Sequence, residues 1–362
     1  GEADLLDVHG CFSLSGRGRL LTSADEKTRV TSYGEPVTHV VLPYDLRGPL
    51  PTRLGAMATE RLTVVRIPGN GAEDVLIGPK GHVWTATEDG SVFRLTPDGH
   101  LVERVGTTGG RPLGLELLGD GRILVCDADR GLLAVDPGSG TVEVLTSHVD
   151  GQPMKFCNNA AVHTDGRIFF TDTSTRYSVH DWKSDLVEAT RTGRLLVRHT
   201  DGSVAVVLSG LEFANGVALS ADESYVAVAE TGARTVVRHW LTGRHAGSHD
   251  YLAEDLPGYP DNMSRGTDGL IWVAIASPRD PVVERIKTGP MALRRGASKL
   301  PEWAQPKPKR TARVMAFDDD GEVVHDRTFD ATHFHMATGV REHHGRVWLG
   351  SLHEPAIAWF DI

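Results

Sequence analysis

CNNAAVHTDG (157–166) is the stretch that decides the fold of this chain, because five other stretches repeat its pattern. In chain order, the other copies are AEDVLIGPKG (72–81), PLGLELLGDG (112–121), ANGVALSADE (214–223), PDNMSRGTDG (260–269) and MATGVREHHG (336–345). An apolar run follows each copy, as in IFFTDT (168–173), and a turn signal such as Asp165-Gly166 separates the two, which is the local chemistry of a tight hairpin.

A third apolar run follows most of these hairpins, for example RLLVRHT (194–200), and fourth runs are visible at HLVERVG (100–106) and TVEVLTS (141–147). Four short strands recurring at fixed order indicate the blades of a β-propeller, and six copies predict six blades. A fold with crossover helices fits badly because long stretches with helical period are nearly absent. A β-sandwich would not explain a pattern repeated in register. We therefore expect an all-β, six-bladed β-propeller.

The propeller is expected to span residues 61–362, with residues 1–60 as an N-terminal extension. The sixth blade runs out near Phe360, so the β-branched run RLTVVRIP (61–68) is predicted to supply its outer strand and close the ring. Residues 174–193 and 277–312 are long insertions in blades three and five, and we expect them to form a lid. A basic surface loop without a role is the alternative for these insertions.

Composition narrows the functional classes. The net charge of −10 argues against a nucleic-acid partner, which requires a basic surface. No apolar run reaches the length of a membrane span. Three cysteines do not make a disulfide framework, so a reducing, cytoplasmic setting is the simplest expectation, although Gly1 leaves a removed leader open. A closed propeller leaves no sheet edge to pair, so we expect a monomer or a weak dimer.

The second position of the repeat, which we call the column, carries the candidate metal ligands. In a closed ring these side chains converge on one axis. Four of them have carboxylate or amide oxygens: Glu73, Asn158, Asn215 and Asp261. Leu113 is the counterpart in the second copy, and the last copy has Ala337, or Thr338 if its loop is one residue shorter. An all-oxygen set favours Ca²⁺, with another divalent cation as the alternative.

Asn215 and Asp261, each taken singly, are also typical of a turn that caps the start of a strand. The whole set in register favours the metal site, because acidic and amide groups gathered at an axis without a cation would repel one another or stay unsatisfied.

Two segments resemble the sequences of the strictosidine synthase-like proteins: EFANGVALSADESYVAVAET (212–231) and LPGYPDNMSRGTDGLIWVA (256–274). Their wider superfamily, with gluconolactonase and paraoxonase, implies a six-bladed propeller with a calcium ion in the channel. The resemblance places calcium ligands at the four polar column residues and a further ligand at Asn262. The positions of a second, structural calcium of paraoxonases are Asp74 and Asn159 here, the latter being Asn where Asp is expected.

Two departures from these relatives limit the chemistry that the resemblance implies. Thr338 stands where strictosidine synthase has its catalytic Glu, so deprotonation of an amine by a carboxylate is not expected. Leu113 and about Ala128 stand where paraoxonase has a His pair.

A hydrolase of a small lactone, ester or related carbonyl compound is the first functional hypothesis, with the metal polarising the carbonyl and a carboxylate activating water. The candidate catalytic residues are Asp261, Asp127 and His335. The expected substrate pocket comprises Leu113, Tyr177, Trp182, Thr338 and His353. Two alternatives stay open: a biosynthetic enzyme that cyclises, condenses or opens a ring, and a non-catalytic propeller that binds a partner.

Overall fold

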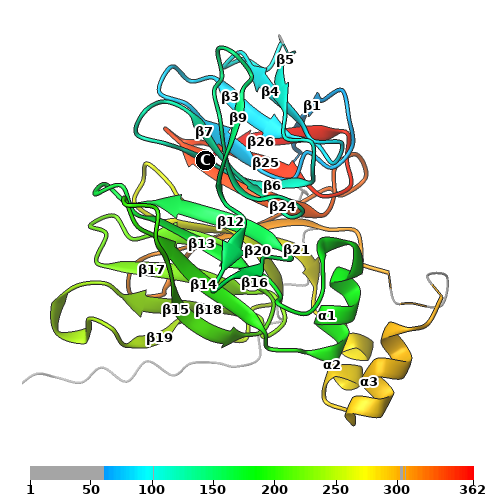
Figure 1. Ribbon diagram of the computed structural model, residues 1–362. Coiled ribbons are helices and arrows are strands. Elements are labelled where there is room, and N and C mark those ends of the chain that lie inside the picture. Colours follow the sequence, from blue (N-terminus) through cyan, green and yellow to red (C-terminus); the bar gives the residue numbers. More distant parts are fainter. Residues whose placement is uncertain (1–60, 101, 302–304, 306) are drawn as a thin grey trace, which may run out of the picture. The chain divides into compact units, whose positions relative to one another are not determined.

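The computed structural model describes residues 61–100, 102–301, 305 and 307–362, so the predicted N-terminal extension lies outside the described residues. The described chain folds into six four-stranded antiparallel sheets and one short two-stranded hairpin. The innermost strands contact one another in chain order, and the last of them contacts the first. The six sheets are therefore the blades of a closed β-propeller, as the repeat predicts (Figure 1).

Blades one to three contain the following strands: β2 (Val75–Ile77), β3 (Val83–Ala86), β4 (Ser91–Leu95) and β5 (Val102–Thr107); β6 (Pro112–Leu117), β7 (Ile123–Asp127), β8 (Gly131–Val135) and β9 (Val142–Thr146); β12 (Cys157–Val162), β13 (Ile168–Asp172), β14 (Gly193–Arg198) and β15 (Val204–Leu211). The two-stranded hairpin comprises β10 (His148–Val149) and β11 (Gln152–Pro153).

Blades four to six contain these strands: β16 (Ala214–Leu219), β17 (Tyr225–Glu230), β18 (Thr235–Trp240) and β19 (His249–Ala253); β20 (Gly258–Arg265), β21 (Ile271–Pro278), β22 (Ala312–Phe317) and β23 (Val323–Phe329); β24 (Ala337–His343), β25 (Arg346–Ser351), β26 (Ala356–Asp361) and β1 (Thr63–Arg66). β1 pairs antiparallel with β26, with Thr63 opposite Trp359. A strand from the N-terminal side thus supplies the fourth strand of blade six.

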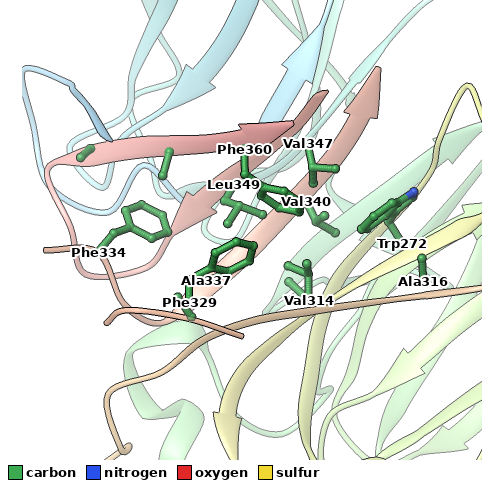
Figure 2. Packing of buried hydrophobic residues seen from close by; sticks show 14 residues of the cluster. Trp272, Val314, Ala316, Phe329, Phe334, Ala337, Val340, Val347, Leu349 and Phe360 are labelled. Carbon is green, nitrogen blue, oxygen red and sulfur yellow. The ribbon is translucent and has the colours of Figure 1, made fainter. Parts of the chain in front are cut away.

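The hydrophobic core lies between neighbouring blades. Between blades five and six, Trp272 and Val314 pack against Val340, Leu349 and Phe360 (Figure 2). Trp272 is fully buried there, and burial of a side chain of this size contributes about 1.5–3 kcal/mol or more. Comparable clusters lie between the other neighbouring pairs of blades. Because every blade is covered on both faces, its central strands are apolar on both sides and its outer strand is only half buried.

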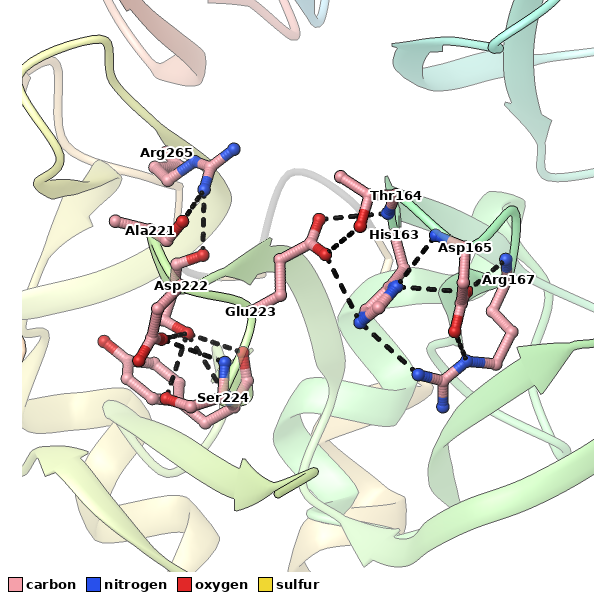
Figure 3. A network of polar contacts seen from close by, with 11 residues as sticks. His163, Thr164, Asp165, Arg167, Ala221, Asp222, Glu223, Ser224 and Arg265 are labelled. Atoms are coloured by element: carbon pink, nitrogen blue, oxygen red, sulfur yellow. Dashed lines mark hydrogen bonds and ion pairs between the residues drawn. The ribbon is translucent and has the colours of Figure 1, made fainter. Parts of the chain in front are cut away.

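Polar contacts between turns tie neighbouring blades together (Figure 3). The Glu223 carboxylate, in the turn between β16 and β17, accepts a hydrogen bond from the Thr164 backbone N–H at 3.0 Å and lies 3.4 Å from Nε2 of His163. Arg265 of blade five donates to the carbonyl oxygens of Ser220 and Ala221 at 2.9 and 2.8 Å. These contacts link blade four to blades three and five on either side of it.

Both long insertions contain helices that the repeat does not predict. The blade-three insertion forms a 3₁₀ turn, η1 (Val179–Asp181), and α1 (Trp182–Glu188), and the blade-five insertion forms α2 (Pro281–Lys287) and α3 (Met291–Ser298). A second 3₁₀ turn, η2 (Gly243–His245), lies between β18 and β19. Asp280 caps the N-terminus of α2, because its carboxylate accepts from the Val282 and Val283 N–H groups, and Pro281 is the first helical residue.

We call α1, α2 and α3 the lid helices, because they contact one another and line the cavity described below (Figure 1). Within the described part of the chain, no helix is both long enough and apolar enough to cross a bilayer. Cys126 and Cys157 are buried and have free thiols.

Candidate metal centre and pocket

A repeated β-bulge places the column. The pairing of the inner strand with the second strand shifts register between Pro112 and Leu115 in blade two, and the same shift recurs in blades three to six. In blade six it falls between Ala337 and Val340, so Thr338 is the column residue of that blade. Bulges re-aim the side chain at the site of the extra residue, which explains why one sequence position serves blades two to six.

In blades two, four and six a glycine follows the column and lets the neighbouring inner strand approach closely. A Cβ atom at Gly216 would lie 2.4 Å from the Met263 nitrogen and 2.5 Å from the Asp261 carbonyl oxygen. A Cβ atom at Gly339 would lie 2.6 Å from the Glu73 carbonyl oxygen. The inner strands of blades five and one could not come this close to blades four and six with any larger residue at these two positions.

The four polar column residues line one cavity of about 450 Å³ together with Leu113. The exposed fractions are 4% for Glu73, 2% for Asn158, 2% for Asn215 and 9% for Asp261. Oε2 of Glu73 and the Oδ1 atoms of Asn158 and Asn215 are buried without a hydrogen-bond partner among the described residues. Three unsatisfied oxygens beside one cavity are costly unless a ligand compensates them.

Two threonines orient the two amides. Asn158 Nδ2 donates to Thr173 Oγ1 at 2.9 Å, and Thr173 Oγ1 donates its own hydrogen to the Ala214 carbonyl at 2.7 Å. Blade four repeats this arrangement with Asn215, Thr231 and the carbonyl of Pro260, at 3.0 and 2.7 Å. Because each hydroxyl hydrogen is already used, each threonine faces the amide as an acceptor. The NH₂ group therefore turns to the threonine, and the amide oxygen stays free.

The carboxyl groups of the column, Glu73 and Asp261, lie where little positive charge offsets their burial. Burial raises the pKa of Glu73 above its usual range, against the lowering effect of Arg111, whose Nη2 lies 3.7 Å from Glu73 Oε2. Burial also raises the pKa of Asp261, although a hydrogen bond from the Asn215 side chain lowers it in part. Two carboxyls with raised pKa values in one buried site gain most from a cation that replaces the lost solvation.

The residues of the column fit a hard cation in donor type and in unsatisfied oxygens. Asn262, a further predicted ligand, is buried with both side-chain polar atoms unpaired among the described residues, but it is not one of the residues that line the cavity. No group of three or more His, Cys, Asp and Glu side chains in the described chain is arranged for a metal, and half of the column's polar donors are amides.

The residues of the implied second calcium do not fit a cation. Asp74 accepts from the N–H groups of Val75 and Leu115 at 2.8 and 2.9 Å, and Asn159 Oδ1 accepts from the Val217 N–H at 2.9 Å. Burial raises the pKa of Asp74 to about 6, although the charge of Arg341 lowers it. Arg341 also pairs with Glu116 at 3.1 Å. The mostly buried side chain of Arg341 thus supplies positive charge beside Asp74.

Two of the three candidate bases lie away from the cavity. Asp127 Oδ1 accepts from the N–H groups of Arg111, Asp129 and Arg130 at 3.0–3.1 Å. Blades three and four have an acidic residue at the same place, the end of the second strand. Asp172 accepts from the Phe156 N–H and Glu230 from the Glu212 N–H, both just before the inner strand. Asp127 therefore has the surroundings of a backbone-supporting residue.

His335 contacts Glu354 through Nδ1 and lies 3.3 Å from an Arg310 nitrogen through Nε2. Its ring nitrogens are occupied by these side chains, and it is not among the residues that line the cavity. Asp261 is the candidate base that does line it.

The predicted pocket residues divide in the same way. Leu113, Trp182 and His353 line the cavity. Tyr177 does not, because its hydroxyl turns to Glu188 Oε1 at 2.8 Å. Thr338 is fully buried beside the column, and its hydroxyl donates to the Glu73 carbonyl at 2.9 Å.

A second ring of pocket residues stands two positions before the column, and sequence reasoning missed it. We call it the upper ring, and its members are Arg111, Phe156, Phe213, Tyr259 and Met336. All five line the cavity, whereas their counterpart in blade one, Gly71, does not. The same repeat register that selects the column could have found them, because the chain enters each inner strand at this position.

Comparison with known proteins supports the fold and identifies the family. A family model described as strictosidine synthase matches residues 158–244. Strictosidine synthase-like 10 of Arabidopsis thaliana is 33% identical over 70% of this chain and 70% of that protein. The adipocyte plasma membrane-associated protein of Gallus gallus is 32% identical over 80% of this chain and 77% of its own length.

Two solved structures show the same fold at low identity. A gluconolactonase from Xanthomonas campestris has a TM-score of 0.61 at 16% identity, covering 83% of this chain and 89% of its own. The calcium-binding protein regucalcin from Agrobacterium tumefaciens has a TM-score of 0.59 at 14% identity, covering 84% and 94%. With a propeller of this type and relatives matched over most of its length, the chain belongs to the strictosidine synthase-like family.

Proposed function

We propose that the protein is a divalent-cation-dependent hydrolase of a lactone or ester, with Ca²⁺ as the preferred ion. The observation that carries the proposal is the set of buried oxygens of Glu73, Asn158 and Asn215 that line one cavity and accept no hydrogen bond within the described part of the chain. Oxygen donors that include two carboxylates match the ligands of Ca²⁺, and the absence of Cys and His from the column disfavours Zn²⁺.

Glu73, Asn158, Asn215 and Asp261 would hold the ion. When bound, a cation with open positions polarises a carbonyl oxygen and stabilises the charge that forms there on attack by water. Arg111 adds a second positive charge in the wall of the cavity, 3.7 Å from Glu73. It would orient an electron-rich carbonyl group and favour the developing negative charge.

Asp261 is the best-placed group to accept the proton of the attacking water, because it is the candidate base whose carboxyl lines the cavity. A carboxylate that binds a cation through one oxygen keeps the other free for this role. A base of this kind is weak, which suits an ester or a lactone better than an amide. The lid helices line part of the cavity and so reduce the contact of the reacting groups with bulk water, which would strengthen charge interactions in the site.

The position of Thr338 argues against the amine chemistry of strictosidine synthesis. Its hydroxyl is used in a hydrogen bond to the Glu73 carbonyl, and it has no carboxylate. A biosynthetic reaction that opens or closes an ester ring would use the same metal and the same Asp261, so it remains an alternative of the same chemistry rather than a separate mechanism.

The test begins with the metal content of the full chain, measured by mass spectrometry after purification without added ions. A panel of lactones and aryl esters is then assayed with and without chelator. The proposal expects about one calcium per chain and hydrolysis that chelator abolishes and calcium restores. Asp261→Ala should lose both the metal and the activity, whereas Glu322→Ala, which removes an exposed carboxylate, should keep both. Full activity in the metal-free Asp261→Ala protein would refute the proposal.

A further inference from the structure

The blade-five insertion differs in charge from the rest of the molecule. The whole chain has a net charge of −10, yet residues 277–312 contain nine lysines and arginines against three acidic residues. Part of this positive charge is used inside the fold. Lys287 is buried and pairs with Glu212 at 2.7 Å, and Arg294 donates to the Glu188 carbonyl at 3.1 Å. These two contacts do not account for the other cations of the insertion.

Three further cations of the insertion lie at the surface of the lid. Arg285 of α2, Arg295 of α3 and Lys299 just after α3 are exposed. No acidic side chain in the described part of the chain forms an ion pair with any of them. Glu284, the one acidic residue within α2 and α3, turns inward and lies 3.5 Å from Arg234. The outer side of the two helices is therefore positively charged.

Large apolar side chains lie among these cations. The exposed fractions are 58% for Val282, 43% for Met291, 54% for Leu293 and 43% for Leu300. Leu300 also lines the cavity, so the other three form the outer set. Elsewhere in the described chain, the exposed large apolar side chains lie on the outer strands of the blades or at the C-terminal Ile362. The water-facing side of a helix is normally polar, so apolar groups gathered there mark a contact surface.

The lid helices connect this surface to the cavity. Ala297 and Ser298 of α3 line the cavity, whereas Met291, Leu293 and Arg295 of the same helix are exposed. α3 packs on α1 and α2, and the lid helices project from the blades at one edge of the molecule (Figure 1). A flat surface can therefore reach their outer side.

The chemistry of this surface fits a lipid bilayer better than a protein partner. Three half-exposed apolar side chains on two short helices fall well short of the roughly 20–30 residues that each side of a stable protein interface contributes. A bilayer needs no matching shape, because apolar side chains enter the headgroup region while cations stay at the level of the lipid phosphates. Each cation close to an anionic leaflet strengthens binding by about fivefold.

We propose that the outer side of α2 and α3 is a docking surface for an anionic lipid bilayer. Its members are Val282, Met291 and Leu293, with Arg285, Arg295 and Lys299. Because the chain as a whole is negatively charged, binding requires this side to face the lipid, and salt at about 0.1 M screens charges that lie more than about 10 Å away. The lid then lies between the cavity and the bilayer. The proposal does not depend on the reaction proposed above.

The test measures sedimentation of the full chain with sucrose-loaded vesicles at about 0.1 M NaCl. Vesicles of phosphatidylcholine with about 30% phosphatidylglycerol are compared with vesicles of phosphatidylcholine alone. We expect binding to be about 100-fold stronger on the anionic vesicles, and to fall about 25-fold when Arg295→Gln and Lys299→Gln are combined. Arg66→Gln with Arg104→Gln is the matched control, because both arginines are exposed on outer strands, and it should leave binding unchanged.

The apolar contribution is measured with a second pair of variants. Met291→Ser with Leu293→Ser should weaken binding by at least about tenfold, whereas Val323→Ser with Val324→Ser, at exposed positions of β23, should not. Circular dichroism checks that each variant is folded. In the unmodified protein, anionic vesicles should slow hydrogen exchange selectively in residues 281–300.

Three results would overturn the proposal. The first is equal binding to both kinds of vesicle or to neither. The second is binding that survives both pairs of lid substitutions, with exchange slowed outside the lid. The third is a dimer in solution that Met291→Ser with Leu293→Ser abolishes, because it would assign the surface to a second copy of the chain.

Discussion

Asn158 Nδ2 donates a hydrogen bond of 2.9 Å to Thr173 Oγ1, and this contact decides which end of the amide faces the cavity. Thr173 is fully buried, and its hydroxyl hydrogen is committed to the Ala214 carbonyl of the next blade at 2.7 Å. The contact between blades three and four therefore sets the chemistry of a residue in the column. Groups behind a ligand tune its affinity for metal in just this way.

Replacing Thr173 by Val should weaken calcium binding by about 10- to 100-fold, because the amide loses the acceptor that orients it. Thr173→Ser keeps the hydroxyl and should restore most of the affinity. Calorimetric titration of the metal-free proteins measures the effect, and circular dichroism checks that the sheets are intact. Equal affinity in Thr173→Val and the unmodified protein would mean that the threonine has no orienting role.

Calcium should raise the thermal stability of the protein, since an ion that binds only the folded state stabilises it by about 2.7 kcal/mol at 100 times its Kd. We expect chelator to lower the melting temperature by several degrees and excess calcium to restore it, as measured by differential scanning calorimetry. Asp261→Ala should remove the calcium dependence. A melting temperature that ignores both chelator and calcium would argue against a metal in the column.

Arg341→Met should destabilise the protein by about 3–5 kcal/mol, because Asp74 and Glu116 would be left near one another without the charge that balances them. Urea unfolding at neutral pH gives the difference. Arg346→Met is the control, since Arg346 pairs with Asp361 at the surface and such a pair contributes about 0–1 kcal/mol. Similar losses in both variants would show that Arg341 does not neutralise the channel.

Tyr177→Phe should loosen the cover of the cavity without unfolding the propeller. It removes the hydroxyl that donates to Glu188 at the end of α1, and the same Glu188 oxygen accepts from Ser298 of α3. Hydrogen exchange should speed up in residues 177–188 and 291–298 and stay unchanged in the inner strands. Tyr251→Phe, at a half-exposed tyrosine of β19, should change neither region. Faster exchange across the inner strands would mean that the contact supports the whole fold.

The fold was predictable from sequence because its signals are local and repeated. Turn pairs such as Asp165-Gly166 and Asp268-Gly269 mark hairpins, and a run of apolar residues marks a strand covered on both sides. The copies then place Asn158, Asn215 and Asp261 at one level of a ring before any contact is known. The run at 61–68 contains β1, which pairs with β26 in blade six.

Hydrogen-bond partners were not predictable, because they come from other parts of the chain. Asp127 sits at a strand end, where a sequence pattern cannot tell a catalytic carboxylate from one that holds the Arg111 backbone. His335 and Tyr177 are reactive in type, yet the structure pairs them with Glu354 and Glu188. A side chain of either kind is available for catalysis only if its neighbours leave it free.

The sequence by itself determined the six blades, the level of the column and the oxygen character of four of its side chains, since each depends on a short repeat with its own strand and turn signals. Only the tertiary structure decided which side-chain oxygens accept no hydrogen bond and which basic residue, Arg341, balances the charge of Asp74. It also decided that Phe156, Phe213 and the lid helices line the cavity. These properties arise where separate blades and insertions meet, and no local pattern encodes the distance between them.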